Sequence, residues 1–120
     1  MSTGRLLLVD DEPDIRAIAK MSLERVGGWE VTAAGSAAEA LVAVQSAAPD
    51  VVLLDVMMPD VDGPEVYAQL RPLLGEAVPI IFLTAKDEHE RLLALGAAGV
   101  IAKPFDPISL PREVAAITAR

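Results

Sequence analysis

An uninterrupted apolar run in the middle of the chain constrains the fold more than any other feature. Residues 51–54 are Val-Val-Leu-Leu, and a single carboxylate, Asp55, follows them directly. A run without polar alternation predicts a strand that is covered on both faces, as in a parallel sheet between two layers of helices. An acid at the carboxyl end of such a strand lies where open α/β sheets bind ligands. Asp55 is therefore a candidate functional residue, although a loop aspartate can also simply cap a strand and face water.

Strand-like and helix-like segments alternate along the rest of the chain. Short apolar runs cover residues 5–9, 29–34, 79–83 and 100–102. Between these runs, apolar side chains recur at spacings of three and four residues, which is the period of an α-helix. Five strand–helix pairs in strict alternation predict an α/β fold with a single doubly wound parallel sheet and helices on both faces. Right-handed crossovers then favour the flavodoxin-like strand order 2-1-3-4-5.

Capping residues and prolines predict where several helices begin. Ser36 is a favourable N-cap for the second helix, and Pro64 suits the first turn of the third. The fourth helix is expected over residues 87–97. An interior proline costs about 3 kcal/mol, so the last helix is expected to begin at Pro111, which leaves it short.

Composition limits the classes of function. The 120 residues are enough for one core, and we expect a single domain over residues 1–120. The chain has no cysteine, which excludes disulfides and thiolate metal sites and is compatible with a cytoplasmic location. No apolar stretch approaches the length of a membrane span. The formal net charge of −8 argues against direct binding of nucleic acid by this chain.

The predicted strand order gathers chemically active side chains at one edge of the sheet. Strands one, three, four and five end next to Asp10 and Asp11, Asp55, Thr84 and Lys103. Three neighbouring carboxylates repel one another unless a cation lies among them, and an all-oxygen ligand set favours Mg²⁺. A carboxylate in such a site can act as a nucleophile, while an ammonium and a hydroxyl hold the oxygens of a phosphoryl group.

These residues, in this order and spacing, resemble the receiver domain of bacterial two-component response regulators. The resemblance extends over essentially the whole chain. Each motif is unspecific alone, but their combination is specific, and it comprises Asp10-Asp11, Asp55, Met58-Pro59, Asp62-Gly63, Thr84-Ala85 and Lys103-Pro104-Phe105.

The resemblance implies a role for each acidic residue of the site. Asp55 would accept a phosphoryl group from a histidine kinase or a phosphotransfer protein. Asp11 would be a direct ligand of Mg²⁺, together with Asp55, and Asp10 would act mostly through water. Met57 would add its backbone carbonyl to the metal.

The remaining motifs are expected to hold the phosphoryl group. By resemblance, Thr84 would bond to a phosphoryl oxygen and shift as it does so. Lys103 would pair with Asp55 before phosphorylation and with the phosphoryl group afterwards. The family also implies a cis peptide bond between Lys103 and Pro104. Phosphorylation would then switch the face formed by the fourth helix, the fifth strand and the fifth helix, which controls a partner or an output domain.

Two positions depart from the family pattern. The family usually has an aromatic residue three positions before the lysine, where this chain has Val100. Either the readout is smaller or differently built, or an aliphatic residue is tolerated there. A last helix shortened at Pro111 would alter the surface that receivers use to dimerise. We therefore expect a monomer or a weak dimer.

Other functions remain as alternatives. The domain could be an unphosphorylated receiver that acts as an interaction scaffold. As a separate question, it could be a stand-alone receiver that binds a partner or relays phosphate, or a part of a longer regulator or hybrid kinase. A phosphohydrolase with an aspartyl nucleophile would need a second Asp two residues after Asp55, where the chain has Met57. A flavin or nucleotide module would need a phosphate-binding loop where Asp10 and Asp11 stand. We expect no enzyme with a free metabolite as substrate, only catalysis of the domain's own phosphorylation and acyl-phosphate hydrolysis.

Overall fold

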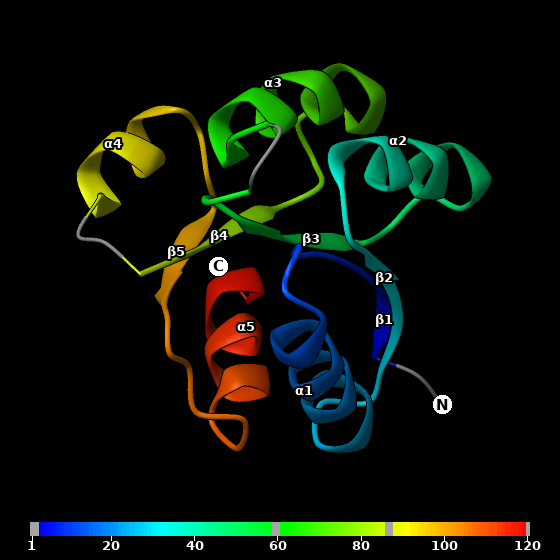
Figure 1. Ribbon diagram of the computed structural model, residues 1–120, viewed down its shortest axis with the longest axis vertical. Helices are drawn as coiled ribbons and strands as arrows, with labels where there is room; N and C mark the ends of the chain where they lie inside the picture. Colours follow the sequence, from blue (N-terminus) through cyan, green and yellow to red (C-terminus); the bar gives the residue numbers. More distant parts are fainter. Residues whose placement is uncertain (1–2, 59–60, 86–87, 120) are drawn as a thin grey trace.

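A five-stranded parallel sheet forms the centre of the computed structural model, which describes residues 3–58, 61–85 and 88–119 (Figure 1). The strand order is β2-β1-β3-β4-β5. This order confirms the predicted doubly wound fold. The strands are β1 (Gly4–Val9), β2 (Trp29–Ala34), β3 (Val51–Asp55), β4 (Ile80–Thr84) and β5 (Gly99–Ala102).

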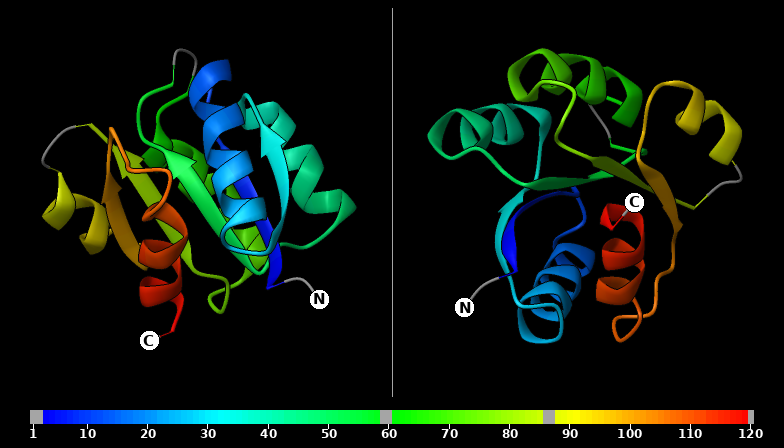
Figure 2. Two further views of the ribbon diagram at one scale, coloured as in Figure 1. Left: turned by 90° about the horizontal axis from the view of Figure 1, so that it is seen from below. Right: turned by 180° about the vertical axis from the view of Figure 1, so that it is seen from behind.

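Helices cover both faces of the sheet, as the apolar run of the central strand predicts. One face carries α1 (Pro13–Arg25) and α5 (Leu110–Thr118). The other face carries α2 (Ala37–Ser46), α3 (Gly63–Leu74) and α4 (His89–Ala94) (Figures 1 and 2). Among the described residues, no helix is long and apolar enough to cross a membrane.

The central strand is buried along its whole length. Residues 51–54 are at most 1% exposed, because their side chains enter two separate apolar clusters in alternation. Val52 and Leu54 join the cluster with residues of α2 and α3, whereas Val51 and Leu53 join the cluster with residues of α1 and α5. This double coverage anchors the strand whose last residue is Asp55.

Most of the predicted helix starts are confirmed. Ser36 caps α2 by accepting a hydrogen bond from the backbone N–H of Glu39 at 3.2 Å. The third helix begins at Gly63, directly before Pro64, and the carboxylate of Asp62 caps it. The fifth helix begins at Leu110 with Pro111 in its first turn, so this helix is short, as expected.

The predicted length of the fourth helix is wrong. We expect residues 87–97 to be helical from the sequence, but α4 ends at Ala94, and Asp87 lies outside the described residues. Gly96 adopts a φ of +108°, which a side chain would make unfavourable and which an α-helix does not contain. The helix therefore stops before this glycine. Pro59 of the predicted Met58-Pro59 motif also lies outside the described residues.

A close backbone approach at Gly63 fixes the loop that follows Asp55. The N–H of Gly63 donates to the carbonyl of Val56 at 2.8 Å. A Cβ atom at Gly63 would lie 2.7 Å from the Cα of Val56 and 2.9 Å from the carbonyl oxygen of Asp55. Glycine is thus required for the start of α3 to pack against the end of β3.

We expect the substitution Gly63→Ala to destabilise the fold by about 1 to 3 kcal/mol, because the added methyl group overlaps backbone atoms that cannot easily move. Gln69→Ala, on the exposed side of the same helix, should change stability by no more than about 0.5 kcal/mol. Urea denaturation followed by circular dichroism measures both. Equal stability of the two variants would show that the loop absorbs the methyl group without strain.

Candidate functional site

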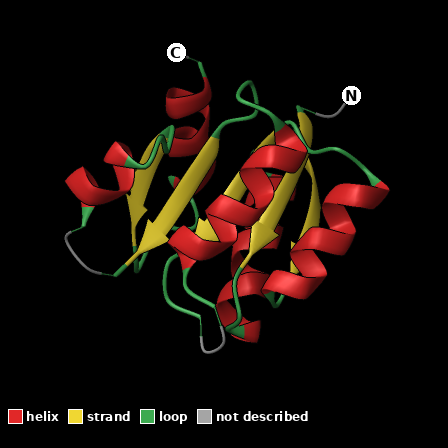
Figure 3. Cartoon of the chain, turned by 90° about the horizontal axis from the view of Figure 1, so that it is seen from above, coloured by secondary structure: helices red, strands yellow, loops and turns green. Residues whose placement is uncertain are grey.

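The parallel strands run in one direction, so their carboxyl ends gather along one edge of the sheet (Figure 3). Asp55 and Thr84 are the last residues of β3 and β4, while Asp10 and Lys103 directly follow β1 and β5. Backbone hydrogen bonds tie these ends together, including one of 2.8 Å from the N–H of Lys103 to the carbonyl of Thr84. Strand order and register therefore place the predicted residues at the same edge.

Lys103 lies at the centre of this cluster. Its ammonium nitrogen is 3.1 Å from Asp10 Oδ2, 3.3 Å from Glu12 Oε1 and 3.4 Å from Asp55 Oδ2. Its side chain is only 11% exposed. The predicted pairing of Lys103 with Asp55 is thus present, but the same ammonium also binds two carboxylates from the loop after β1.

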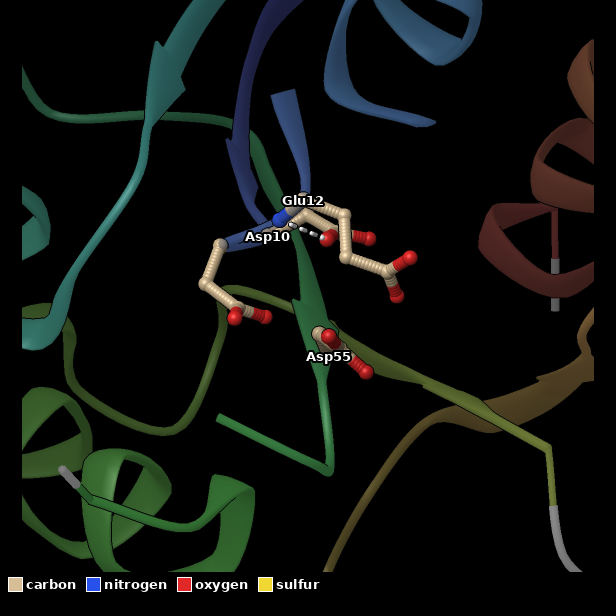
Figure 4. Close-up of side chains that lie close together, drawn as sticks. Asp10, Glu12 and Asp55 are labelled. Atoms are coloured by element: carbon tan, nitrogen blue, oxygen red, sulfur yellow. Dashed lines mark hydrogen bonds between the residues drawn. The ribbon is translucent and has the colours of Figure 1, made fainter. Parts of the chain in front are cut away.

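Four acidic residues meet at this point. Carboxylate oxygens of Asp10, Asp11, Glu12 and Asp55 all lie within 4.8 Å of one another. Figure 4 shows the carboxylates of Asp10 and Glu12, which belong to the loop after β1, close to Asp55 at the end of β3. Asp10 and Asp55 are buried, whereas Glu12 is exposed. Glu12 is a site residue that was not predicted from the sequence, although its position directly after two adjacent aspartates is a usable signal.

Burial and neighbouring charge both disturb the ionisation of Asp55. The pKa of Asp55 is raised from 3.8 to about 6. The larger cause is the loss of hydration on burial and the smaller is the negative charge of Asp10, while Lys103 acts in the opposite direction. Burial lowers the pKa of Lys103, but the charges of Asp55 and Asp10 outweigh burial and hold that pKa above its ordinary value of 10.5. Lys103 is therefore positively charged at neutral pH.

The residues present fit a divalent cation. Asp11 Oδ1 and Asp55 Oδ2 are buried and accept no hydrogen bond from the described residues. A buried carboxylate oxygen that accepts no hydrogen bond is costly, and a cation placed between these two oxygens would offset that cost. All the ligands available are oxygens, which suits a hard ion such as Mg²⁺.

The other predicted positions lie around this cluster. The backbone N–H of Met57 donates to Asp55 Oδ1 at 3.2 Å, which places residue 57 beside the carboxylate, although the role of its carbonyl stays a prediction. Thr84 is buried. The peptide bond between Lys103 and Pro104 is cis, as predicted.

Val100 occupies the position where an aromatic residue is usual. It pairs in register with Phe82 on β4. Its partly buried side chain packs against the apolar cluster described above that contains residues of α2 and α3, and that also contains Leu92 of α4. In that cluster the ring of Tyr67 from α3 stacks on Phe82, with 5.8 Å between ring centroids. Aromatic side chains are thus present on this face of the sheet, but they come from β4 and α3.

Comparisons with known proteins agree with this arrangement. The family model for the response regulator receiver domain matches residues 6–115. The alkaline phosphatase synthesis transcriptional regulatory protein PhoP of Bacillus subtilis is 41% identical over 119 residues, which cover 97% of this chain and 49% of PhoP. The transcriptional regulatory protein TrcR of Mycobacterium tuberculosis is 41% identical over 104 residues, which cover 84% of this chain and 40% of TrcR.

The fold has close structural relatives as well. The chemotaxis protein CheY4 of Vibrio cholerae superposes with a TM-score of 0.86 at 33% identity, and the match covers 98% of both chains. By contrast, the chain spans only part of the two transcriptional regulators above: 49% of the length of PhoP and 40% of the length of TrcR. The match over residues 6–115 and the shared fold lead to one conclusion: this chain belongs to the response regulator receiver domain family.

Proposed function

We propose that the chain, as one receiver domain over residues 1–120, is a phosphorylation switch in which Asp55 accepts a phosphoryl group from a histidine kinase or a phosphotransfer protein. One observation carries the proposal. The buried oxygen Asp55 Oδ2 accepts no hydrogen bond from the part of the chain that the structure describes, and it lies 3.4 Å from the ammonium of Lys103 and beside the acidic cluster. A nucleophile needs such an available oxygen, and the incoming phosphoryl group needs nearby positive charge.

The chemistry follows from the atoms in the site. An oxygen of the Asp55 carboxylate attacks the phosphorus of a phosphohistidine, an oxygen–phosphorus bond forms, and the phosphorus–nitrogen bond breaks as the imidazole leaves with a proton from solvent. Lys103 then binds the phosphoryl oxygens, and the hydroxyl of Thr84 binds another. A magnesium ion held by Asp11, Asp55 and the Met57 carbonyl, with Asp10 acting through water, would supply further positive charge against those oxygens.

The readout surface in this proposal comprises α4, β5 and α5. Thr84 ends the strand that neighbours β5 and pairs there with Ala102, so a movement of Thr84 toward the phosphoryl group acts on β5 two residues from Val100. The apolar packing of Val100 against Phe82 would make the change at this surface smaller than a rotating ring would produce. The phosphoryl group biases a two-state equilibrium of that surface, which binds a downstream protein or an output domain.

The proposal also defines the cellular setting. The domain acts in the cytoplasm as a monomer or a weak dimer, and it catalyses only its own phosphorylation and the hydrolysis of its acyl phosphate. The net charge of −8 disfavours contact of this chain with nucleic acid. A scaffold function without phosphorylation has no observation in its favour, and a phosphohydrolase would lack its general acid, because Met57 stands at that position.

We expect incubation with a small acyl phosphate and Mg²⁺ to add one phosphoryl group to the wild-type protein. Asp55→Asn should add none, because the amide is not a nucleophile, and a chelator should abolish labelling of the wild type. Asp14→Asn, which removes an exposed acid of α1, is the matched control and should be labelled normally. Intact-mass spectrometry measures the addition. Labelling that persists in Asp55→Asn, or without the metal, contradicts the proposal.

A second prediction concerns stability against pH with a chelator present. Because the native pKa of Asp55 is about 6 and the ordinary value is 3.8, the native state binds more protons than the unfolded chain between these values. Stability therefore falls as the pH rises through this window. Asp55→Asn should be more stable than the wild type at pH 8, by about 1 to 3 kcal/mol, and this advantage should shrink toward pH 4. Thermal unfolding across pH measures the difference, and a constant difference would refute the predicted shift.

A further inference from the structure

Lys103 has more carboxylate partners than the proposed phosphoryl transfer requires. The ammonium lies within 3.4 Å of Asp10, Glu12 and Asp55, and of these distances the one to Asp55 is the longest. Hydrogen bonds join Lys103 to Asp10 and Glu12. Two of the three carboxylates that hold the lysine therefore come from the loop after β1.

Glu12 differs from the other two partners in its surroundings. It stands at the N-cap of α1, yet its side chain makes no capping hydrogen bond. Its backbone N–H donates to Asp10 Oδ1 at 2.9 Å, which fixes the loop. The Glu12 side chain is 58% exposed, whereas that of Asp55 is 2% exposed. The ammonium thus lies between a solvent-exposed carboxylate and a buried one.

The oxygen of Asp55 that faces Lys103 is also the oxygen that suits a cation. Asp55 Oδ1 accepts a hydrogen bond from the N–H of Met57, while Oδ2 accepts none from residues 3–58, 61–85 and 88–119. A divalent cation and the ammonium of Lys103 therefore compete for Asp55 Oδ2. Any group that draws Lys103 away from this oxygen favours the cation.

We propose that Glu12 is a positioning residue that holds Lys103 away from Asp55 Oδ2 and thereby keeps this oxygen available to a divalent cation. The inference rests on the proposed function and adds a residue to its site. The Glu12 end of the pair with Lys103 is exposed to solvent, which weakens an ion pair, so Lys103 can exchange Glu12 for a phosphoryl group once that group arrives. Glu12 therefore acts on the cation through Lys103, and this route distinguishes it from a direct ligand.

The test is a double-mutant cycle with Mg²⁺ affinity as the readout, measured by isothermal titration calorimetry without any phosphodonor. The four proteins are the wild type, Glu12→Gln, Lys103→Met and the double variant. We expect Glu12→Gln to weaken Mg²⁺ binding by about two- to five-fold, the range that one exposed ion pair spans. In the Lys103→Met background the same substitution should have a clearly smaller effect, because no ammonium remains to be held.

Glu24→Gln is the matched control. It removes one negative charge from α1, the helix that Glu12 precedes, and breaks an exposed ion pair with Lys20, and it should leave Mg²⁺ affinity unchanged. Circular dichroism establishes that each variant is folded. An equal loss of affinity in both backgrounds would show that Glu12 acts on the cation directly and would overturn the inference, as would no loss at all. If the wild type itself fails to bind Mg²⁺, the proposed function fails and not this inference alone.

Discussion

Repulsion between buried carboxylates is the constraint on which this site depends. Asp10 and Asp55 lie at the ends of two adjacent strands and are almost fully removed from water. Burial makes the ionisation of Asp55 costly, and the neighbouring charge of Asp10 adds to that cost. The ammonium of Lys103 offsets part of this cost, since it lies within ion-pair distance of both carboxylates. In the proposed function, the remaining negative charge attracts a cation and, through that cation, a phosphoryl group.

The fold supplies the rigidity that such a site needs. Two apolar clusters pack against β3 from opposite faces of the sheet, so the core fixes the position of Asp55 at the end of this strand. The close approach of Gly63 to Val56 fixes the segment that leaves the site. Because β1 and β3 are neighbours in the sheet, residues 45 positions apart in the sequence, Asp10 and Asp55, meet without any long connection across the surface. The carboxylates therefore cannot move apart to relieve their repulsion.

Much of this arrangement could be predicted from the sequence because it depends on strong, local patterns. The apolar run before Asp55 implies a doubly covered strand, and the alternation of segments then restricts the strand order. Once the order is known, the strand ends place the site residues. Glu12 could not be assigned in this way, because exposed acids are common and its partner Lys103 is 91 residues away. The early end of α4 depends on the single backbone angle of Gly96, which its local sequence did not reveal.

Chemical trapping of the phosphorylated residue tests the central claim most directly. Borohydride reduces an acyl phosphate on aspartate to homoserine, and peptide sequencing by tandem mass spectrometry then locates the reduced residue. For protein phosphorylated in the presence of Mg²⁺, our account predicts homoserine at position 55 and at no other aspartate. Homoserine at position 10 or 11, or a phosphoryl group that resists borohydride, would contradict the assignment of Asp55 as the phosphoacceptor.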